Sequence, residues 1–296
     1  MYRIGNAPTS WGVERPDGPG NPPWSRFLDE AAAAGYAGVE LGPLGYLPTD
    51  PGVLAAALAS RNLDLTAGYV LDKFWSRSDH DEIVAQARRV CSLLQSQGAR
   101  NLVLISAIVE ERTRTAGRSD AARRLDAAEA AQFAATIGEL TQIAADHGLV
   151  AGLHPHAGTH LEFEDEIDRV LDSEQAADCG LVIDTGHLTY AGIDPVRFTA
   201  ERAGRVRYVH VKDIDAAVLA RMLAAGADFW EAYAAGVFCV LGTGVVDFAA
   251  FRDALAGGGY DGWLTVEQDA DPGGQSVPID DARRSLAFLR DQGLAR

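Results

Sequence analysis

The sequence predicts an α/β fold in which eight parallel strands close into a single (β/α)8 TIM barrel with helices outside. Short apolar, β-branched runs alternate with stretches of helical length along the 296 residues, and this alternation is typical of a parallel sheet. Eight such units follow one another, which is the number that closes a barrel, and barrels commonly use about 250 residues as one domain. We therefore expect one domain over residues 1–296.

An open, doubly wound sheet is the alternative fold for such an alternation. That fold carries a glycine-rich phosphate-binding turn of the form GxGxxG after its first strand. The stretch after the first strand here reads NAPTSWGVE and contains no such turn. The barrel is therefore favoured.

The first half of the chain supplies four strands and four helices in alternation. The strands are apolar, β-branched runs, expected at 2–7, 36–41, 63–69 and 101–106. The helices are the amphipathic or alanine-rich stretches, expected at 24–34, 51–60, 79–97 and 126–147. Gly35, Gly98 and Gly148 directly follow three of these helices, as a C-cap glycine does. The polar stretch 110–121 is expected to rise above the barrel.

The second half repeats the pattern with one long insertion. Strands are expected at 149–153, 181–184, 206–211 and 263–266. Helices are expected at 163–171, 195–203, 216–225, 248–256 and 280–292. The longest connection, 214–247, contains one of these helices and the segment GVFCVLGTG. Long connections in compact domains tend to be functional walls or lids, so this one is expected to border the site.

The composition excludes several classes of protein. There are 26 Lys and Arg residues against 42 Asp and Glu, a net charge of −16, which disfavours nucleic acids and anionic membranes because both are bound through basic patches. The chain has no run of about 18 apolar residues, and its start lacks the pattern of a signal peptide. The three cysteines are scattered without a CxxC pair, so no disulfide framework is expected. We expect a cytoplasmic protein.

Four strands in the second half end abruptly in polar residues. Their sequences run LVAGLHPHAGTHLE, LVIDTGH, RVRYVHVKD and LTVEQD. The polar residues at these strand ends are His154, His156, Asp184, His187, His210, Lys212, Asp213, Glu267, Gln268 and Asp269. Functional residues of a parallel barrel sit at the carboxyl ends of its strands. Four successive strands that deliver a histidine or a carboxylate to one rim predict a metal site.

Each ligand candidate has a competing structural explanation. Asp184 could cap the following turn, but His187 three residues later favours a functional role. A lone histidine on an apolar strand is more often a core residue, but His210 is followed at once by Lys212 and Asp213. A buried, unpaired carboxylate at Glu267 would be costly, and a metal ion would compensate its charge.

His154 and His156 flank a proline and lie two residues apart, so they point to the same side of an extended chain. One is expected to be a metal ligand and the other a substrate group, and the spacing leaves open which is which. With Asp184, His210 and Glu267 they form a mixed nitrogen and oxygen set, which suits Mn²⁺, Co²⁺, Fe²⁺ or Zn²⁺ better than Ca²⁺.

Four other polar residues receive weaker assignments. His160 and Glu162 remain open between a pocket position and a surface position. Asn6 and Glu40 end the first two strands and are expected to face the same cavity, without an assigned role.

Five motifs, HPHAGT, IDTGHL, VHVKD, GVFCVLGTG and WLTVEQD, resemble those of the inosose dehydratase group within the xylose-isomerase-like TIM barrels. That superfamily also contains ketose 3-epimerases, hydroxypyruvate isomerases and a DNA-repair endonuclease. The matching motifs span residues 149–269 and are specific as a set, whereas the N-terminal third is similar to the superfamily only in a general way.

The resemblance implies a divalent metal, most often Mn²⁺ or Co²⁺, with Mg²⁺, Fe²⁺ and Zn²⁺ as alternatives. Carried over by position, Asp184, His210 and Glu267 are ligands, and His154 stands where the epimerases and isomerases have a glutamate. The resemblance also implies a small polyol or keto-sugar substrate and a homo-oligomer, either a dimer or a tetramer.

The histidine at this position bears on the reaction. The epimerases of the superfamily use two metal-bound glutamates on opposite faces of the sugar, one to remove a proton and one to return it. An elimination needs only one base and one acid. The expected function is therefore removal of water from a polyhydroxylated cyclic ketone, such as 2-keto-myo-inositol in inositol catabolism, by abstraction of the α-proton through an enediolate held by the metal.

The roles follow from this expectation. Glu267, His154 and His156 are the candidate bases, in that order. His187 or the pair Lys212 and Asp213 would protonate the departing hydroxyl, although the pair could instead be purely structural. The residues expected to contact substrate are Trp11, His156, His187, Phe238 and Gln268. Trp11 and Phe238 fit pocket walls and packing above the barrel equally well.

Several other functions compete with the dehydratase. A ketose or hydroxypyruvate isomerase or epimerase would use the same metal, and a second carboxylate on the metal, such as Glu162, would favour it. A ferrous oxygenase with two histidines and one carboxylate and a sugar-binding barrel without catalysis are further alternatives. A DNA-repair nuclease is disfavoured by the acidic composition.

Overall fold

The predicted barrel is confirmed by a computed structural model, which describes residues 1–268 and 277–295. One sheet has the strand order β3-β2-β1-β11-β8-β7-β6-β5-β4, and its neighbours pair in parallel. The strands are β1 (Arg3–Asn6), β2 (Gly38–Val39), β3 (Asp64–Leu65), β4 (Ala67–Asp72), β5 (Asn101–Ser106), β6 (Val150–His154), β7 (Gly180–Asp184), β8 (Val206–Val211) and β11 (Trp263–Val266).

The two ends of this strand order are one continuous segment, which closes the barrel. Only Thr66 separates β3 from β4. β3 pairs with β2, and β4 pairs with β5. The ladder to the second strand continues through the break, because Thr66 N donates to Val39 O at 2.9 Å and Leu41 N donates to Ala67 O at 2.9 Å. The expected strand 63–69 is therefore divided between two neighbours, and the open-sheet alternative is wrong.

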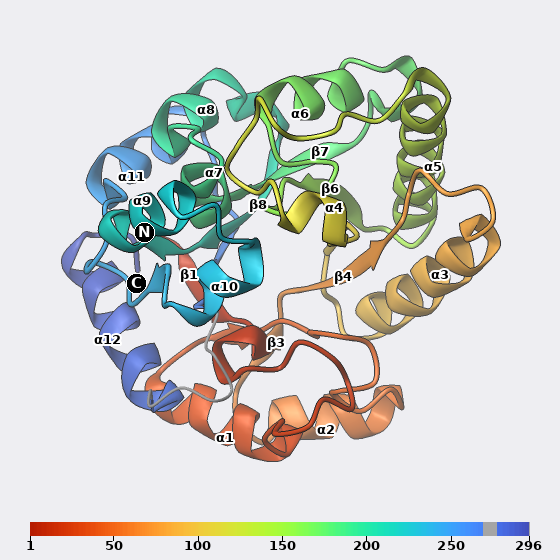
Figure 1. Ribbon diagram of the computed structural model, residues 1–296. Coiled ribbons are helices and arrows are strands. Elements are labelled where there is room, and N and C mark those ends of the chain that lie inside the picture. Colours follow the sequence, from red (N-terminus) through yellow and green to blue (C-terminus); the bar gives the residue numbers. More distant parts are fainter. Residues whose placement is uncertain (269–276, 296) are drawn as a thin grey trace.

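The helices that alternate with the barrel strands form the outer ring in Figure 1. They are α1 (Trp24–Ala34), α2 (Pro51–Ala59), α3 (His80–Ser96), α5 (Ala127–Asp146), α6 (Glu164–Leu171), α8 (Pro195–Glu201), α11 (Phe248–Gly257) and α12 (Pro278–Asp291). Their apolar faces pack on the strands, as the fully buried Phe27, Phe133, Phe198 and Phe251 illustrate. Each agrees with the sequence expectation to within about two residues.

The remaining α-helices and a two-stranded pair belong to the loops that follow the carboxyl ends of the strands. They are α4 (Glu110–Thr113), α7 (Thr185–Tyr190), α9 (Ala216–Ala224), α10 (Phe229–Ala234) and the antiparallel pair β9 (Asp213–Ile214) and β10 (Phe238–Cys239). In Figure 1, α4 and α10 lie inside the ring of outer helices. The sequence analysis anticipated the excursion 110–121 and the helix 216–225, but it missed α7 and α10, which are too short to show a clear apolar period.

A small aromatic and aliphatic layer fills the barrel interior below the site. Tyr208 is 1% exposed and packs with Val103 and Val182. Its hydroxyl contacts Thr66 Oγ1 at 2.8 Å and also Thr265 Oγ1, so a buried polar group is satisfied inside the barrel. The Tyr208 ring lies edge-on to the His210 ring, with centroids 5.4 Å apart, and so supports the histidine from below.

Two expectations from composition can be compared with this fold. Cys91, Cys179 and Cys239 are all free thiols, in line with the expected lack of a disulfide framework. Within residues 1–268 and 277–295, no helix combines the length and the apolar character needed to cross a membrane.

Candidate metal centre

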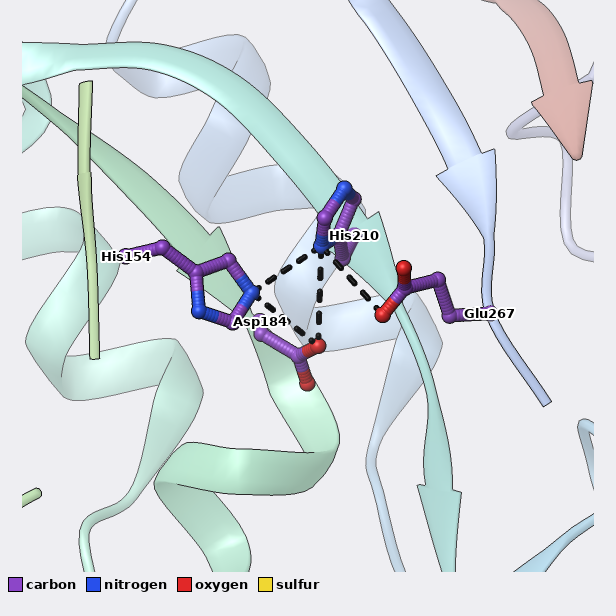
Figure 2. A group of neighbouring side chains, drawn as sticks. All are labelled: His154, Asp184, His210 and Glu267. Carbon is purple, nitrogen blue, oxygen red and sulfur yellow. Dashed lines mark hydrogen bonds and ion pairs between the residues drawn. The ribbon is translucent and has the colours of Figure 1, made fainter. Parts of the chain in front are cut away.

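Four neighbouring strands bring two histidines and two carboxylates together. His154 ends β6, Asp184 ends β7, His210 lies in β8, and Glu267 follows β11. One potential ligand atom from each residue lies within 4.8 Å of the others. Figure 2 shows the four side chains converging from adjacent strands. The structure thus groups the four residues proposed from sequence, and it places His154, not His156, in the group.

The separations between these atoms match those of ligands around one ion. Metal–ligand bonds of about 2.1 Å place neighbouring ligand atoms roughly 3.0–3.4 Å apart. His210 Nδ1 lies 3.0 Å from His154 Nε2, 3.5 Å from Glu267 Oε2 and 3.8 Å from Asp184 Oδ2. His154 Nε2 lies 3.6 Å from Asp184 Oδ2. Small rotations of these side chains would bring all four atoms onto one cation.

Asp184 is oriented for this task by the start of α7. Its Oδ1 accepts the backbone N–H groups of Gly186 and His187, at 2.8 and 2.9 Å, as an N-cap aspartate does. Its Oδ2 is buried and makes no hydrogen bond among the described residues. Burial opposes ionisation, but Lys212 and His187 nearby bring the pKa of Asp184 well below its usual value. A buried, ionised oxygen without a donor is what a cation site requires.

His210 is held by a carboxylate that the sequence analysis left without a role. Its Nε2 donates to Glu40 Oε1 at 2.6 Å, and both side chains are 2% exposed. This fixes Nδ1 as the atom that faces the other ligands, the arrangement in which an outer carboxylate orients a metal-binding histidine. Glu40 follows β2 directly, so its position at a strand end was the signal available in the sequence.

The metal-free charge balance of the site depends on His210. Burial alone would lower its pKa, but Glu267 and Glu40 raise it to about 9. Burial likewise would raise the pKa of Glu267, whereas His210 and Lys212 hold it below the usual value. At neutral pH the metal-free cluster therefore carries a protonated His210, and a metal ion must displace that proton to bind.

Lys212 lies directly beside the ligand set. Its Nζ is 3.1 Å from Glu267 Oε2, 3.6 Å from Asp184 Oδ2 and 3.0 Å from His187 Nε2. Its stem passes over Gly186, where an added Cβ would lie only 2.6 Å from Lys212 Cγ. The glycine of the IDTGH motif is thus required for the lysine to reach the carboxylates.

His156 and His187 stack beside the cluster, with ring centroids 3.6 Å apart. His156 lines the cavity, and its Nδ1 lies 2.8 Å from Ala157 O. Because a carbonyl oxygen only accepts, Nδ1 carries the proton and Nε2 is an acceptor. Burial, His154 and Lys212 lower the pKa of His156 to about 3, so the ring is neutral.

The cavity beside the cluster has a volume of about 70 Å³. Of the four ligand residues, His154 and Glu267 line it. The described residues that line it are Thr9, Glu14, Tyr69, Leu71, Ile105, Ile108, His154, His156, Lys212, Phe229, Trp230, Tyr233 and Glu267. The sequence analysis missed Glu14, Tyr69 and the aromatic face of α10. The signal for α10 was the capping box formed by Asp228 and Glu231.

Two residues expected at the site, Trp11 and Asp213, have other contacts. Trp11 faces α1, where its Nε1 donates to Glu30 Oε2 at 2.7 Å and its ring packs on Phe27. Asp213, expected to be catalytic, accepts four backbone N–H groups, from Ile214, Gly242, Gly244 and Val246. The Asp213 carboxylate therefore anchors the loop of the GVFCVLGTG segment instead of facing the cavity.

Phe238, His187 and Gln268 surround the site without lining the cavity. Phe238 packs on the His187 ring, with centroids 5.2 Å apart, and lies 4.8 Å from Lys212 Nζ. His187 is 1% exposed and lies behind His156. The backbone N–H of Gln268 donates to Ser10 Oγ at 3.0 Å. Asp269, the last residue of the WLTVEQD motif, lies outside the described residues.

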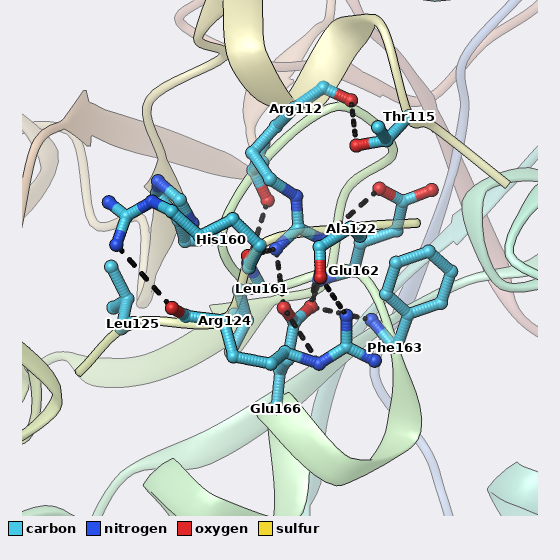
Figure 3. A network of polar contacts seen from close by, with 12 residues as sticks. Arg112, Thr115, Ala122, Arg124, Leu125, His160, Leu161, Glu162, Phe163 and Glu166 are labelled. Atoms are coloured by element: carbon cyan, nitrogen blue, oxygen red, sulfur yellow. Dashed lines mark hydrogen bonds and ion pairs between the residues drawn. The ribbon is translucent and has the colours of Figure 1, made fainter. Parts of the chain in front are cut away.

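Glu162 belongs to a separate buried network, shown in Figure 3. Its carboxylate accepts the N–H groups of Gly117 and Gly158, at 2.6 and 3.1 Å, and lies 3.5 Å from the Arg112 guanidinium. Arg112 also donates to Glu166 Oε2 at 3.1 Å. The network ties the loop after β5 to the loop that follows His156, and it leaves Glu162 off the ligand set.

His160 lies beside the same network. Its Nε2 is 3.2 Å from Glu111 Oε1, and its ring lies edge-on to Trp75 with centroids 4.7 Å apart. It is 3% exposed and does not line the cavity. His160 is therefore buried away from the cavity beside the metal cluster, and it lines a separate small pocket with Phe133 and Glu166.

Comparisons with known proteins agree with this architecture. A family model described as "Xylose isomerase-like TIM barrel" matches residues 28–292. The rhizopine catabolism protein MocC of Rhizobium meliloti is 32% identical, covering 99% of this chain and 88% of that protein. The inosose dehydratase of Geobacillus thermodenitrificans is 28% identical, covering 98% of this chain and 96% of that protein. Relatives that are named as dehydratases over nearly the whole chain indicate that the protein is an enzyme.

Solved structures share the fold at lower sequence identity. The IOLI protein with a bound zinc atom is similar with a TM-score of 0.74 at 14% identity, covering 98% of this chain and 97% of that one. D-allulose 3-epimerase from Methylomonas sp. has a TM-score of 0.70 at 19% identity, covering 98% of each chain. At such identities the similarity establishes the barrel fold.

Removal of the Glu40 charge should weaken metal binding. We expect Glu40→Gln to raise the dissociation constant for Co²⁺ or Zn²⁺ roughly 10- to 100-fold, because His210 loses the carboxylate that orients it. Isothermal titration calorimetry against a competing chelator measures this directly. Glu30→Gln is the matched control, since Glu30 contacts Trp11 and Arg26 away from the site. Equal affinities for both variants would contradict the role of Glu40.

Glu162 should make the stability of the fold depend on pH. Burial raises its pKa to about 7, against the lowering effects of the Gly117 N–H and Arg112, whereas an unfolded glutamate has a pKa of about 4.3. A raised folded pKa means that the contribution to stability is full below about pH 4 and is lost as the pH rises through about 7.

The free energy of unfolding of the wild type, measured relative to Glu162→Gln, should therefore fall by on the order of 1–3 kcal/mol between pH 5 and pH 8. Urea denaturation of both proteins at the two pH values tests this. Glu174→Gln, at an exposed position, serves as the control and should show no such change. If the difference in free energy of unfolding between the wild type and Glu162→Gln were equal at both pH values, Glu162 would not titrate in this range.

Proposed function

The chain belongs to the xylose isomerase-like TIM barrel family, and from this premise we propose that it is a metal-dependent dehydratase of a polyhydroxylated cyclic ketone such as 2-keto-myo-inositol. The observation that carries the proposal is the composition of the ligand group. His154 occupies the β6 position, so Glu267 is the one carboxylate of the group that lines the cavity. A site with one cavity-lining carboxylate among its ligands suits an elimination, which needs one base. It suits an epimerisation less well, because that reaction removes a proton from one face of the sugar and returns one to the other. The relatives named inosose dehydratase point in the same direction.

His154, Asp184, His210 and Glu267 would hold the divalent ion, for which we propose Mn²⁺ or Co²⁺. When bound, such an ion supplies Lewis acidity that polarises a carbonyl oxygen and makes the adjacent C–H group more acidic. The fit rests on the spacing of the four ligand atoms and on the buried Asp184 Oδ2 that has no donor among the described residues.

Glu267 is the base that we assign to the α-proton. Its Oε2 faces His210 and Lys212 at 3.5 and 3.1 Å. Among the described residues, its Oε1 has only a long contact of 3.5 Å with Thr9 Oγ1, so this oxygen is the one that we expect to accept a proton from substrate. A base within hydrogen-bond reach of the carbon acid contributes roughly 10²- to 10⁴-fold to such a step.

Lys212 and His156 have complementary tasks. Lys212 presents a positive charge to the cavity, which stabilises the anion formed when the α-proton leaves. His156 offers Nε2 as a neutral acceptor, so it can orient a substrate hydroxyl without competing for the proton. Among the acids expected for the departing hydroxyl, Lys212 lines the cavity, whereas His187 lies behind His156 and Asp213 is committed to backbone groups.

The α10 helix supplies an apolar wall for a ring substrate. Phe229, Trp230 and Tyr233 line the cavity from one helix, and Trp230 is 43% exposed. Aromatic faces pack well on the C–H surfaces of a cyclic polyol, while its hydroxyl groups remain free for polar partners. A cyclic substrate is therefore favoured over an extended one.

Two competing functions are less well supported. An isomerase or epimerase would be favoured by Glu162 or another glutamate on the metal in place of His154, but His154 belongs to the group and Glu162 is bound instead to Gly117 and Gly158. A ferrous oxygenase needs two histidines and one carboxylate with open positions, whereas this group adds a second carboxylate.

The proposal is tested by following the reaction in D₂O. Metal-stripped protein is reloaded with Mn²⁺ or Co²⁺, given 2-keto-myo-inositol, and removed before proton NMR of the products. We expect a dione formed by loss of water. Asp184→Ala and His210→Ala should abolish it because the ligand set is broken, whereas His80→Ala, which alters a partly exposed histidine paired with Glu139, should retain it.

The other outcomes separate the alternatives. Deuterium that enters the substrate without loss of water would overturn the dehydratase in favour of an isomerase or epimerase. No change in the substrate would exclude this ketone.

A further inference from the structure

We propose that Glu14 is the general acid that protonates the departing hydroxyl, held in place at the cavity wall by Tyr233 of α10. The inference rests on the proposed dehydratase function and adds the group that the elimination still lacks. Glu14 lies in the loop after β1, shortly beyond a short 3-10 helix at Pro8–Trp11.

The position of Glu14 is fixed by contacts on the cavity side. It lines the same cavity as His154, Lys212 and Glu267. Tyr233 Oη donates to Glu14 Oε1 at 3.1 Å, so a residue of the inserted segment 214–247 holds a carboxyl group from the opposite end of the sequence. Glu14 is not part of the ligand group, and its carboxyl group is therefore not needed to hold the ion.

The electrostatic setting suits a carboxyl group that holds a proton. Partial desolvation at the cavity wall raises the pKa of Glu14, and the negative charge of Glu267 adds to this, while the Tyr233 hydrogen bond and Lys212 act in the opposite direction. The residue as a whole is exposed, so the carboxyl group can regain its proton from solvent after each turnover.

The other groups that line the cavity fit this role less well. His156 offers only an acceptor nitrogen to the cavity, because its Nδ1 proton is bound to Ala157 O. Lys212 lies against Glu267 and Asp184, beside the base. A group beside the base serves the α-carbon, whereas the departing hydroxyl is on the next carbon. Glu14 lines the same cavity without belonging to the ligand group, so it is available to the second reacting carbon.

The step balances as follows. Glu267 has taken the α-proton, and the electron pair left behind forms the new carbon–carbon double bond. The bond between the β-carbon and its hydroxyl oxygen breaks, and its electron pair leaves with the oxygen. That oxygen takes the proton of the Glu14 carboxyl group and departs as water, and the Glu14 carboxylate is reprotonated from solvent. The enol that remains becomes the dione by proton transfer.

The test measures two steps separately in Glu14→Gln. If Glu14 is the acid, exchange of the α-proton for deuterium should continue at near the wild-type rate, while loss of water should fall roughly 10²- to 10⁴-fold. Tyr233→Phe should give a smaller fall, because the carboxyl group remains but loses its positioning contact. Asp17→Asn, an exposed carboxylate of the same loop, is the matched control and should behave as wild type.

A substrate analogue makes the test specific for acid catalysis. Fluoride leaves with less need of a proton than hydroxide does, so an analogue with fluorine in place of the departing hydroxyl should release fluoride from Glu14→Gln at near the wild-type rate. A variant that is equally impaired in deuterium exchange, water loss and fluoride release would overturn the assignment and make Glu14 a binding residue. Unchanged loss of water would also overturn it. Failure of the wild type to form the dione would instead overturn the proposed function itself.

Discussion

Two carboxylates buried at one end of the barrel impose the constraint on which the rest of the site depends. Asp184 is fully buried and the Glu267 side chain is 12% exposed, and the desolvation of such groups costs several kcal/mol unless partners compensate it. The compensation comes from backbone N–H groups at the start of α7, from the ammonium of Lys212 and from the imidazoles of His154 and His210. Each of these partners is itself positioned by another part of the fold.

The barrel supplies that positioning through the order of its strands. β6, β7, β8 and β11 are consecutive neighbours in the sheet, so residues at their carboxyl ends meet although they are distant in sequence. β2 contributes from the other side, where Glu40 holds His210 by its outer nitrogen. Gly186 removes the one Cβ that would block Lys212. The insertion 214–247 then closes the cavity with α10 and ties Glu14 to it through Tyr233.

The grouping of the four candidate ligands was predictable because each follows an apolar run, and in a parallel barrel such positions share one rim. The sequence did not predict which of His154 and His156 joins the group, because residues two apart lie on the same side of an extended strand. The structure ends β6 at His154, and this places His154 in the group. Asp213 was misjudged because a carboxylate after a strand can also bind backbone N–H groups of its own loop. Glu14 was missed and Glu40 was left without a role because their partners lie 219 and 170 residues away in sequence, and no local pattern records such a contact.

The most direct test of the central claim is anomalous diffraction at the manganese edge from crystals loaded with Mn²⁺. The account predicts one strong peak surrounded by His154 Nε2, Asp184 Oδ2, His210 Nδ1 and Glu267 Oε2, with Glu40 remaining on His210 Nε2. A peak elsewhere would contradict the account. The account would be contradicted equally if no peak appeared and the Lys212 ammonium alone lay between the carboxylates of Asp184 and Glu267.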